Sequence, residues 1–312
     1  MPPLIVIGGA TATGKTELAI RLVEGLARES RPVAIISADS RQVFRGLDIG
    51  TAKATAADRA RVPHFGLDLV EPDQPFSVAD FVAHAHGVLV DLQARAGVAI
   101  LAGGTGLYLR AVGRGLDTAA LPSDRAVRAS LEADLLRDGL AVLVGRLVAR
   151  APSLAARIDL HNKRRVVRAL EIAELAGDVD LPSLQGYPGR ALWLGLTVEP
   201  DEHARRIVRR ARAQFDAGLI DEAGGLRERF DPALPAFSAI GYREAWAVLD
   251  GELTLEAAIA LDAGRNVAFA RRQRTWFRAE PGITWLDATG ELPTTTAIEL
   301  ARRAIGEPAA AG

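Results

Sequence analysis

The sequence predicts an α/β protein in which a parallel sheet core is flanked by helices and interrupted by an all-helical inserted domain. Short, continuously apolar runs alternate with segments of helical periodicity, as happens when strands are buried on both faces of a parallel sheet. A glycine-rich motif for phosphate binding joins the first apolar run to the first helical segment. In the middle of the chain the apolar runs stop and only helical patterns continue, which indicates an insertion into the sheet domain.

Composition and charge favour a soluble globular protein and exclude several kinds of site. The 312 residues, 49% of them hydrophobic, suffice for one large domain or two modest ones. A net charge of −1 provides no global field, so a nucleic acid would have to be met by local patches. The absence of cysteine excludes disulfides and thiolate metal sites and favours the cytoplasm. We expect neither a secretory signal nor a membrane span, because the first strand starts at Leu4 and no apolar run reaches about 18 residues.

The first strand, residues 4–7, and the first helix, residues 17–28, are joined by a complete phosphate-loop motif. The motif fits G-x-x-x-x-G-K-[ST] and consists of Gly9, Ala10, Thr11, Ala12, Thr13, Gly14, Lys15 and Thr16. In such a loop, backbone N–H groups and the helix N-terminus bind phosphate oxygens. The motif therefore predicts a P-loop NTPase-like fold. Lys15 would bridge phosphates and Thr16 would ligate magnesium. A mere glycine-rich turn is the alternative, but strand, spacing and helix all agree with a phosphate site.

Two further strands are expected to end beside this loop. The second apolar run, residues 33–37, is followed by Asp39, at the carboxyl edge of the sheet where ligands bind in open α/β proteins. A turn cap is an equally good interpretation of this aspartate. A crossover helix then leads to the third strand, residues 98–102, which is followed by Gly-Gly-Thr at residues 103–105. This strand lacks the acidic residue with which an ordinary P-loop ATPase holds magnesium.

The inserted domain is expected at residues 121–189, between the core segments 1–120 and 190–312. Its last helical pattern opens with a basic run at residues 163–168, which alone is more typical of a solvated helix face. Residues 191–198 restore a buried strand, so the sheet resumes after the insertion. In the helix that begins near residue 201, Arg206 and Arg210 share one face and could clamp a diphosphate.

The C-terminal segment 265–278 combines five arginines with aromatic residues and has no acidic residue. Cations bind phosphates and flat rings stack on unpaired bases, so this composition is compatible with a nucleic-acid surface. The aromatic residues could instead belong to the core, which is the better interpretation of this segment alone. A strand at residues 283–286 and a helix at 296–305 complete the sheet domain. The five histidines are scattered and predict no transition-metal site.

Six segments occur in order along the chain: GGATATGKTELAI, ISADSRQVFRGLDIGTAK, GGTGLYLRAV, KRRVVRALEI, SAIGYREAW and ARRQRTWFR. Together they resemble the tRNA dimethylallyltransferase family. The resemblance implies transfer of a dimethylallyl group from dimethylallyl diphosphate to the exocyclic N6 amine of the adenosine immediately 3′ of the anticodon in tRNA. Diphosphate would be released, and the loop would hold it in place of ATP, which agrees with the missing acidic residue. The helical insertion would contact the anticodon stem-loop. We expect a monomer.

The resemblance also implies roles for individual residues. Asp39 would act as the general base on the amine, while Lys15, Arg210, and Thr16 with magnesium would stabilise the departing diphosphate. The residues implied to contact tRNA are Asp39, Ser40, Arg41, Gln42, Thr105, Arg128, Arg164, Arg165, Arg168, Gly241, Tyr242, Arg243, Arg271, Arg272, Gln273, Arg274 and Arg278. For the arginines of this set, phosphate binding becomes a better interpretation than a solvated face.

The chain departs from the family pattern at three places. Residues 158–162, with Asp159 and Asn162, read IDLHN where the family usually has IHPND. Residues Asn266 to Ala268 replace a Thr-Arg-Gln sequence, and Gln214 stands where a methionine is common. These changes bear on the details of tRNA contact, whereas the phosphate loop and Asp39 are intact.

Three alternative functions stay open on the sequence. The phosphate loop with Asp39 would also suit a small-molecule or nucleotide kinase that consumes ATP, although a second magnesium ligand is missing. A non-catalytic RNA-binding module would use the arginine clusters alone. A prenyltransferase acting on free adenylate would use the loop but has no obvious need for the helical insertion.

Overall fold

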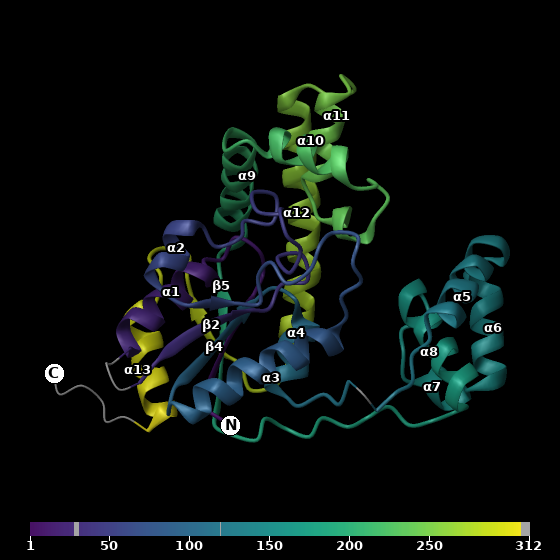
Figure 1. The fold of residues 1–312 in the computed structure, drawn as a ribbon, viewed down its shortest axis with the longest axis horizontal. Helices are drawn as coiled ribbons and strands as arrows, with labels where there is room; N and C mark the ends of the chain where they lie inside the picture. Colours follow the sequence, from purple (N-terminus) through teal and green to yellow (C-terminus); the bar gives the residue numbers. More distant parts are fainter. Residues whose placement is uncertain (28–30, 119, 307–312) are drawn as a thin grey trace. The chain divides into compact units, whose positions relative to one another are not determined.

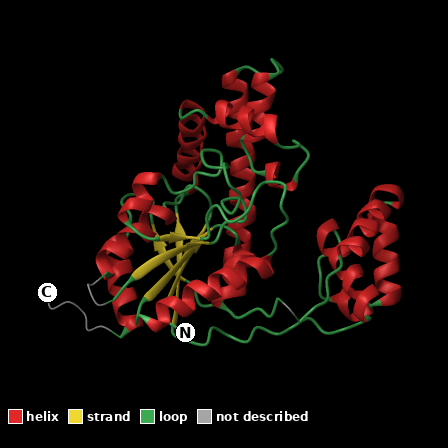
Figure 2. Ribbon diagram, in the orientation of Figure 1, coloured by secondary structure: helices red, strands yellow, loops and turns green. Residues whose placement is uncertain are grey.

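The computed structural model describes residues 1–27, 31–118 and 120–306, and the chain divides into two compact units (Figure 1). The core unit comprises Met1–Gly115 and Gly186–Gly312, and the insertion unit comprises Leu116–Gln185. Figure 2 shows that the strands of the described residues gather in the core unit, whereas helices build the insertion unit.

The core unit contains a six-stranded sheet, counted over the described residues, in the order β3-β2-β4-β1-β5-β6. Each neighbouring pair runs parallel, which confirms the predicted α/β fold. The strands are β1 (Leu4–Gly9), β2 (Val33–Ser37), β3 (His64–Phe65), β4 (Val98–Gly103), β5 (Ala191–Thr197) and β6 (Thr284–Asp287). The edge strand β3 has two residues, too few for the apolar pattern to reveal it.

Helices cover both faces of the sheet because successive strand residues point to opposite faces. In β1, Ile5 and Ile7 pack into one cluster with α1 (Lys15–Leu26) and α13 (Thr294–Ile305). Leu4 and Val6 pack into another cluster with α3 (Val78–Ala94), α4 (Gly106–Gly113) and α12 (Leu255–Arg278). The other helices of the core unit and their bounds are α2 (Ala56–Arg61), α9 (Pro200–Asp216), α10 (Leu219–Arg229), a 3-10 turn (Pro235–Ser238) and α11 (Tyr242–Leu249). Position 28, the expected end of the first helix, lies outside the described residues.

The insertion unit has a hydrophobic core of its own. Its helices are α5 (Arg125–Asp138), α6 (Leu140–Arg150), α7 (Pro152–Ala156) and α8 (Lys163–Ala176). Leu143, Leu147, Leu154 and Leu170 are buried between them. In neither unit does a described helix combine the length and apolar character that a bilayer crossing requires.

A buried ammonium group fixes the segment that connects β2 to α2. The Lys53 side chain is 1% exposed, and its Nζ donates to the Phe44 carbonyl (2.8 Å) and to the carboxylates of Asp48 and Asp68 (2.6 Å each). The three N–H donors of lysine thus meet three acceptors.

We expect the Lys53→Met substitution to lower the free energy of unfolding by about 3 kcal/mol, because three acceptors lose their buried donor. Urea denaturation followed by circular dichroism measures this change. The Arg59→Met variant is the matched control, since Arg59 binds the same Asp68 from a more exposed position (2.7 Å) and should cost about 1 kcal/mol or less. Equal losses in the two variants would contradict the special role of the buried ammonium.

Candidate active site

The phosphate loop turns from β1 into α1 and leaves the start of that helix open to an anion. Gly14 caps α1 with a φ of 93°, a left-handed conformation that side-chain-bearing residues rarely adopt. Having no side chain, Gly14 does not occupy the first N–H groups of the helix. These N–H groups and the positive end of the helix dipole are the features through which the predicted site would bind an anion.

Lys15 and Arg210 bring two positive charges to this loop. Lys15 Nζ donates to the Ala10 carbonyl (2.5 Å), and Arg210 Nη1, from α9, donates to the Thr11 hydroxyl (2.9 Å). Burial and then the nearby charge of Arg210 lower the pKa of Lys15 to about 7, although the charge of Asp39 acts in the opposite direction. Burial also lowers the pKa of Arg210. A diphosphate would stabilise both cations, because its oxygens would replace neutral partners with charged ones.

The three threonine hydroxyls of the loop differ in their availability. Thr13 donates to the Ala10 carbonyl (2.9 Å), and Thr11 accepts from Arg210. The exposed Thr16 makes no side-chain hydrogen bond to a described residue, so its hydroxyl is available to a ligand. Residues 1–27, 31–118 and 120–306 contain no cluster of three acidic or histidine side chains that could hold a metal. A magnesium ion bound mainly by substrate phosphates and water, with one hydroxyl from the protein, fits this arrangement.

The contacts of Asp39 are compatible with both interpretations of its sequence position, a turn cap and a ligand-binding residue. Its Oδ1 accepts hydrogen bonds from the backbone N–H groups of Arg41 (2.8 Å) and Gln42 (3.4 Å), which is a turn cap. No described residue donates to its Oδ2, so this oxygen is available to a substrate. The cap therefore orients the carboxylate while leaving half of its acceptor capacity unused.

The loops that follow β2 and β4 are tied together by hydrogen bonds. The Thr105 N–H donates to the Ala38 carbonyl (3.1 Å), and the Thr105 hydroxyl accepts from the Ser40 N–H (3.0 Å). Asp39 lies between the two residues that Thr105 contacts. Thr105 thus fixes the backbone on both sides of the carboxylate.

Two buried side chains that the sequence did not assign to the phosphate site also hold its loop. His203, on α9, contacts the Thr11 carbonyl through Nε2 (2.7 Å), and Gln273, on α12, accepts from the Thr11 N–H (2.8 Å). His203 precedes Arg210 by seven residues, which puts both on one helix face. This seven-residue spacing is the sequence feature that could have placed His203 at the phosphate loop. Arg206, predicted on that face too, instead binds Glu202 (3.0 Å) and the Thr289 carbonyl (2.7 Å).

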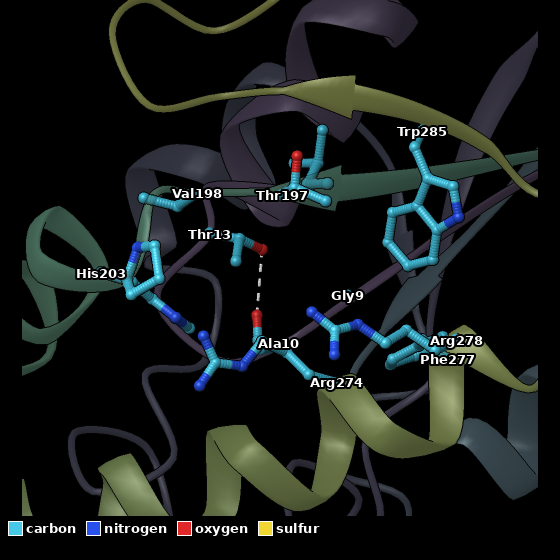
Figure 3. Close-up of a pocket in the computed structure, with 12 residues that line it drawn as sticks. Gly9, Ala10, Thr13, Thr197, Val198, His203, Arg274, Phe277, Arg278 and Trp285 are labelled. Carbon is cyan, nitrogen blue, oxygen red and sulfur yellow. Dashed lines mark hydrogen bonds between the residues drawn. The ribbon is translucent and has the colours of Figure 1, made fainter.

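A cavity of about 310 Å³ borders the phosphate loop (Figure 3). Phe277 and Trp285 contribute aromatic walls, and the view shows Arg274 and Arg278 extending from α12. The cavity is lined by Gly9, Ala10, Thr13, Leu196, Thr197, Val198, Pro200, His203, Arg274, Phe277, Arg278 and Trp285. An apolar wall beside a cationic loop suits a ligand that joins a phosphate group to a hydrocarbon.

Several residues predicted to contact tRNA have exposed side chains: Arg164, Arg165, Arg243, Arg271, Arg272 and Arg278. Among the partly buried ones, Arg41 donates to the Pro235 carbonyl (2.9 Å), and Arg274 faces the cavity. Gly241 is buried, and its N–H donates to Glu244 (3.0 Å). Exposure leaves the first group free to meet a phosphate backbone, and tRNA contact stays a prediction for all of them.

Other residues of the predicted tRNA set are engaged inside their own unit. Arg128 and Arg168 both bind the fully buried Glu171 carboxylate in the insertion unit (2.8 Å each). In the core unit, Tyr242 Oη donates to Glu222 (2.7 Å), and the Gln42 amide donates to the Thr51 (3.0 Å) and Ala52 (3.2 Å) carbonyls. These contacts give each side chain a structural role, beside which any contact with tRNA remains a prediction.

The departures from the family pattern also have structural partners. Asn162 caps α8 by accepting from the Arg165 N–H (3.3 Å), and Asn266 donates to Asp262 on the preceding turn (2.8 Å). Gln214 donates to the Ile49 (2.6 Å) and Gly50 (2.9 Å) carbonyls, which lie in the loop between β2 and α2. Asn162, Asn266 and Gln214 therefore each make side-chain hydrogen bonds within the fold.

Comparisons with known proteins show to which family this chain is related. The family model for IPP transferase matches residues 42–280. The tRNA dimethylallyltransferase of Anaeromyxobacter dehalogenans strain 2CP-C is 46% identical, over 91% of this chain and 94% of that protein.

Solved structures extend the likeness to three dimensions. A tRNA isopentenylpyrophosphate transferase from Bacillus halodurans is 38% identical, with a TM-score of 0.70 over 97% of this chain and 95% of that one. A eukaryotic dimethylallyltransferase acting on tRNA, 23% identical, has the same fold, with a TM-score of 0.79 over 100% of this chain and 81% of that one. With a family match that spans most of its length and relatives of this similarity, the chain belongs to the IPP transferase family, as its motifs predict.

Proposed function

We propose that this protein transfers the dimethylallyl group of dimethylallyl diphosphate to the N6 amine of the adenosine immediately 3′ of the anticodon in tRNA, releasing diphosphate. One observation carries the proposal: Lys15 and Arg210 converge on a phosphate loop while the nearby Asp39 keeps one carboxylate oxygen free. Membership of the IPP transferase family, with relatives named tRNA dimethylallyltransferase, supports both the transferred group and the acceptor.

On the donor side, the loop N–H groups, Lys15 and Arg210 would bind the diphosphate. When the allylic C–O bond breaks, its electron pair leaves with the diphosphate, and these fixed donors stabilise the growing negative charge. Magnesium, held by Thr16 and phosphate oxygens, would supply further positive charge. The cavity walls formed by Leu196, Val198 and Phe277 suit the five-carbon chain.

On the acceptor side, Asp39 Oδ2 would accept a hydrogen bond and then the proton from the attacking amine. An aryl amine is a weak nucleophile, so proton removal during C–N bond formation prevents positive charge from accumulating on nitrogen. The Arg41 N–H holds the other carboxylate oxygen, which limits rotation of the base. The adenine would have to leave the stacked anticodon loop to reach this carboxylate.

The exposed arginines support tRNA as the acceptor. Arg164 and Arg165 on the insertion unit, and Arg243, Arg271 and Arg272 on the core unit, would bind the phosphate backbone of the anticodon stem-loop. We further propose that the protein acts as a monomer in the cytoplasm, where the substrate tRNA occurs.

Transfer of labelled dimethylallyl from its diphosphate to tRNA tests the proposal directly. Label should enter tRNA that carries adenosine 3′ of the anticodon and should not enter a transcript with guanosine at that position. Consumption of ATP with formation of a phosphorylated product would support the kinase alternative instead. Binding of tRNA without label transfer would support the non-catalytic alternative.

A further inference from the structure

Thr11, in the phosphate loop, is held by side chains from two helices. His203 contacts its carbonyl (2.7 Å), Arg210 donates to its hydroxyl (2.9 Å), and Gln273 accepts from its N–H (2.8 Å). The Gln273 side chain also reaches the loop after β4, because its amide nitrogen donates to the Gly104 carbonyl (2.9 Å). One buried amide therefore joins the phosphate loop to the loop that follows β4.

The chemistry of the two contacts suits an amide at position 273. The Thr11 N–H can only donate and the Gly104 carbonyl can only accept, so the bridging side chain needs an acceptor and a donor side by side. Space is equally restricted, since a Cβ on Gly104 would lie 2.4 Å from Gln273 Nε2. Glutamine at one end and glycine at the other are thus matched.

Gln273 lies on a different face of α12 from its arginine neighbours. It is 7% exposed and lies on the same helix face as the buried Ala270 and Phe277, whereas Arg271 and Arg272 are exposed. A residue placed inward in this way is poorly positioned to touch RNA. The adjacent arginines remain available for that role.

The hydrogen bonds of Gln273 connect further to the backbone beside Asp39. Gly104 precedes Thr105, whose hydroxyl accepts from the Ser40 N–H (3.0 Å) beside Asp39. The path from Thr11 through Gln273, Gly104 and Thr105 connects the diphosphate loop with the base. Each step is a short hydrogen bond or a covalent neighbour.

We propose that Gln273 is a positioning residue rather than a tRNA contact. It holds the phosphate loop at a fixed distance from the loops that follow β2 and β4, the first of which carries Asp39. This inference rests on the proposed function for its effect on turnover. Because a misplacement of about 1 Å can cost about 10²-fold in rate, loss of the bridge should slow transfer without weakening RNA binding.

The Gln273→Met variant tests the proposal, since methionine has a similar length and lacks both hydrogen-bonding groups. We expect the Kd for inorganic diphosphate, measured by calorimetry, to rise about tenfold and kcat to fall by about 10–100-fold. The Kd for tRNA, measured by filter binding without donor, should stay within about twofold of the parent value. The Arg272→Ala variant is the matched comparator on the same helix and should show the reverse pattern, with weaker tRNA binding and unchanged diphosphate binding.

Two further variants keep the test independent of any folding defect in the first. Gln273→Glu retains the acceptor but can donate to the Gly104 carbonyl only when the carboxyl is protonated. A buried carboxyl can titrate between about pH 6 and 8. The activity of this variant relative to the parent should therefore rise as the pH falls from 8 to 6. Gly104→Ala leaves glutamine in place and displaces its amide, so it should show the same raised diphosphate Kd as Gln273→Met.

The outcomes separate this inference from the proposed function. Weaker tRNA binding with unchanged diphosphate binding in Gln273→Met would overturn the positioning role, as would a Gln273→Glu activity ratio that does not change with pH. Failure of the parent protein to transfer label would overturn the proposed function alone, because the diphosphate Kd would still report on the bridge.

Discussion

The Asp39→Ala variant should transfer dimethylallyl groups about 10²–10⁴-fold more slowly than the parent protein, the range expected for loss of a general base. Single-turnover transfer of labelled donor to tRNA measures this rate. The structure gives the reason for a large effect, because Asp39 has a free oxygen at the carboxyl edge of the sheet and a second oxygen fixed by the Arg41 N–H (2.8 Å). Binding of tRNA should persist, since many phosphate contacts share the affinity.

Asp39→Asn separates proton acceptance from turn capping. The amide oxygen can still accept from the Arg41 and Gln42 N–H groups, but an amide does not take up a proton near neutral pH. If Asp39 is the base, the asparagine variant should be nearly as slow as the alanine variant while its thermal stability matches that of the parent. A parental rate in Asp39→Asn would show that the carboxylate serves only the turn.

The sheet and the phosphate loop could be predicted because their signals are local. β1, β2, β4 and β5 are continuous apolar runs, and the loop between β1 and α1 has a fixed spacing of glycine, lysine and threonine. The edge strand β3 could not be predicted, because two residues are too few to show a periodic pattern. The side chains that hold the phosphate loop could not be predicted for another reason: Gln273 and His203 contact Thr11 from 262 and 192 residues away in the sequence.

The arginine clusters show where charge patterns in a sequence become ambiguous. Arg165 and Arg168 belong to the same basic run, yet Arg165 is exposed while Arg168 binds the buried Glu171 (2.8 Å). The run alone could not distinguish a side chain that pairs within the fold from one that faces solvent, because the partner's burial depends on packing between helices. For the same reason, the sequence could not distinguish Arg210, which faces the phosphate loop, from Arg206, which binds Glu202.

Replacing Lys15 by methionine should lower kcat by about 10²–10³-fold, the cost of removing one preorganised donor to a developing anion. The same single-turnover assay measures it. Lys15 donates to the Ala10 carbonyl (2.5 Å), so the ammonium lies within its own loop and needs little reorganisation to meet a phosphate there.

The titration of Lys15 adds a signature that other cationic residues would not share. Burial and Arg210 lower its pKa to about 7, so the free loop loses this charge as the pH rises above 7. A bound anion favours the protonated form. The affinity for inorganic diphosphate should therefore be greatest below pH 7 and fall by up to about tenfold for each pH unit above it, until the pKa of the complex is reached.

Calorimetry with inorganic diphosphate from pH 6 to 9 measures this decline, and two variants isolate its source. Lys15→Arg keeps the charge at every pH in this range, so only the ionisation of diphosphate itself should remain in its profile. Lys15→Met should bind more weakly and give the same residual profile, because it has no group to titrate. If the parent protein follows the arginine variant across the whole range, the loop lysine stays charged when empty, and its burial does not tune diphosphate binding.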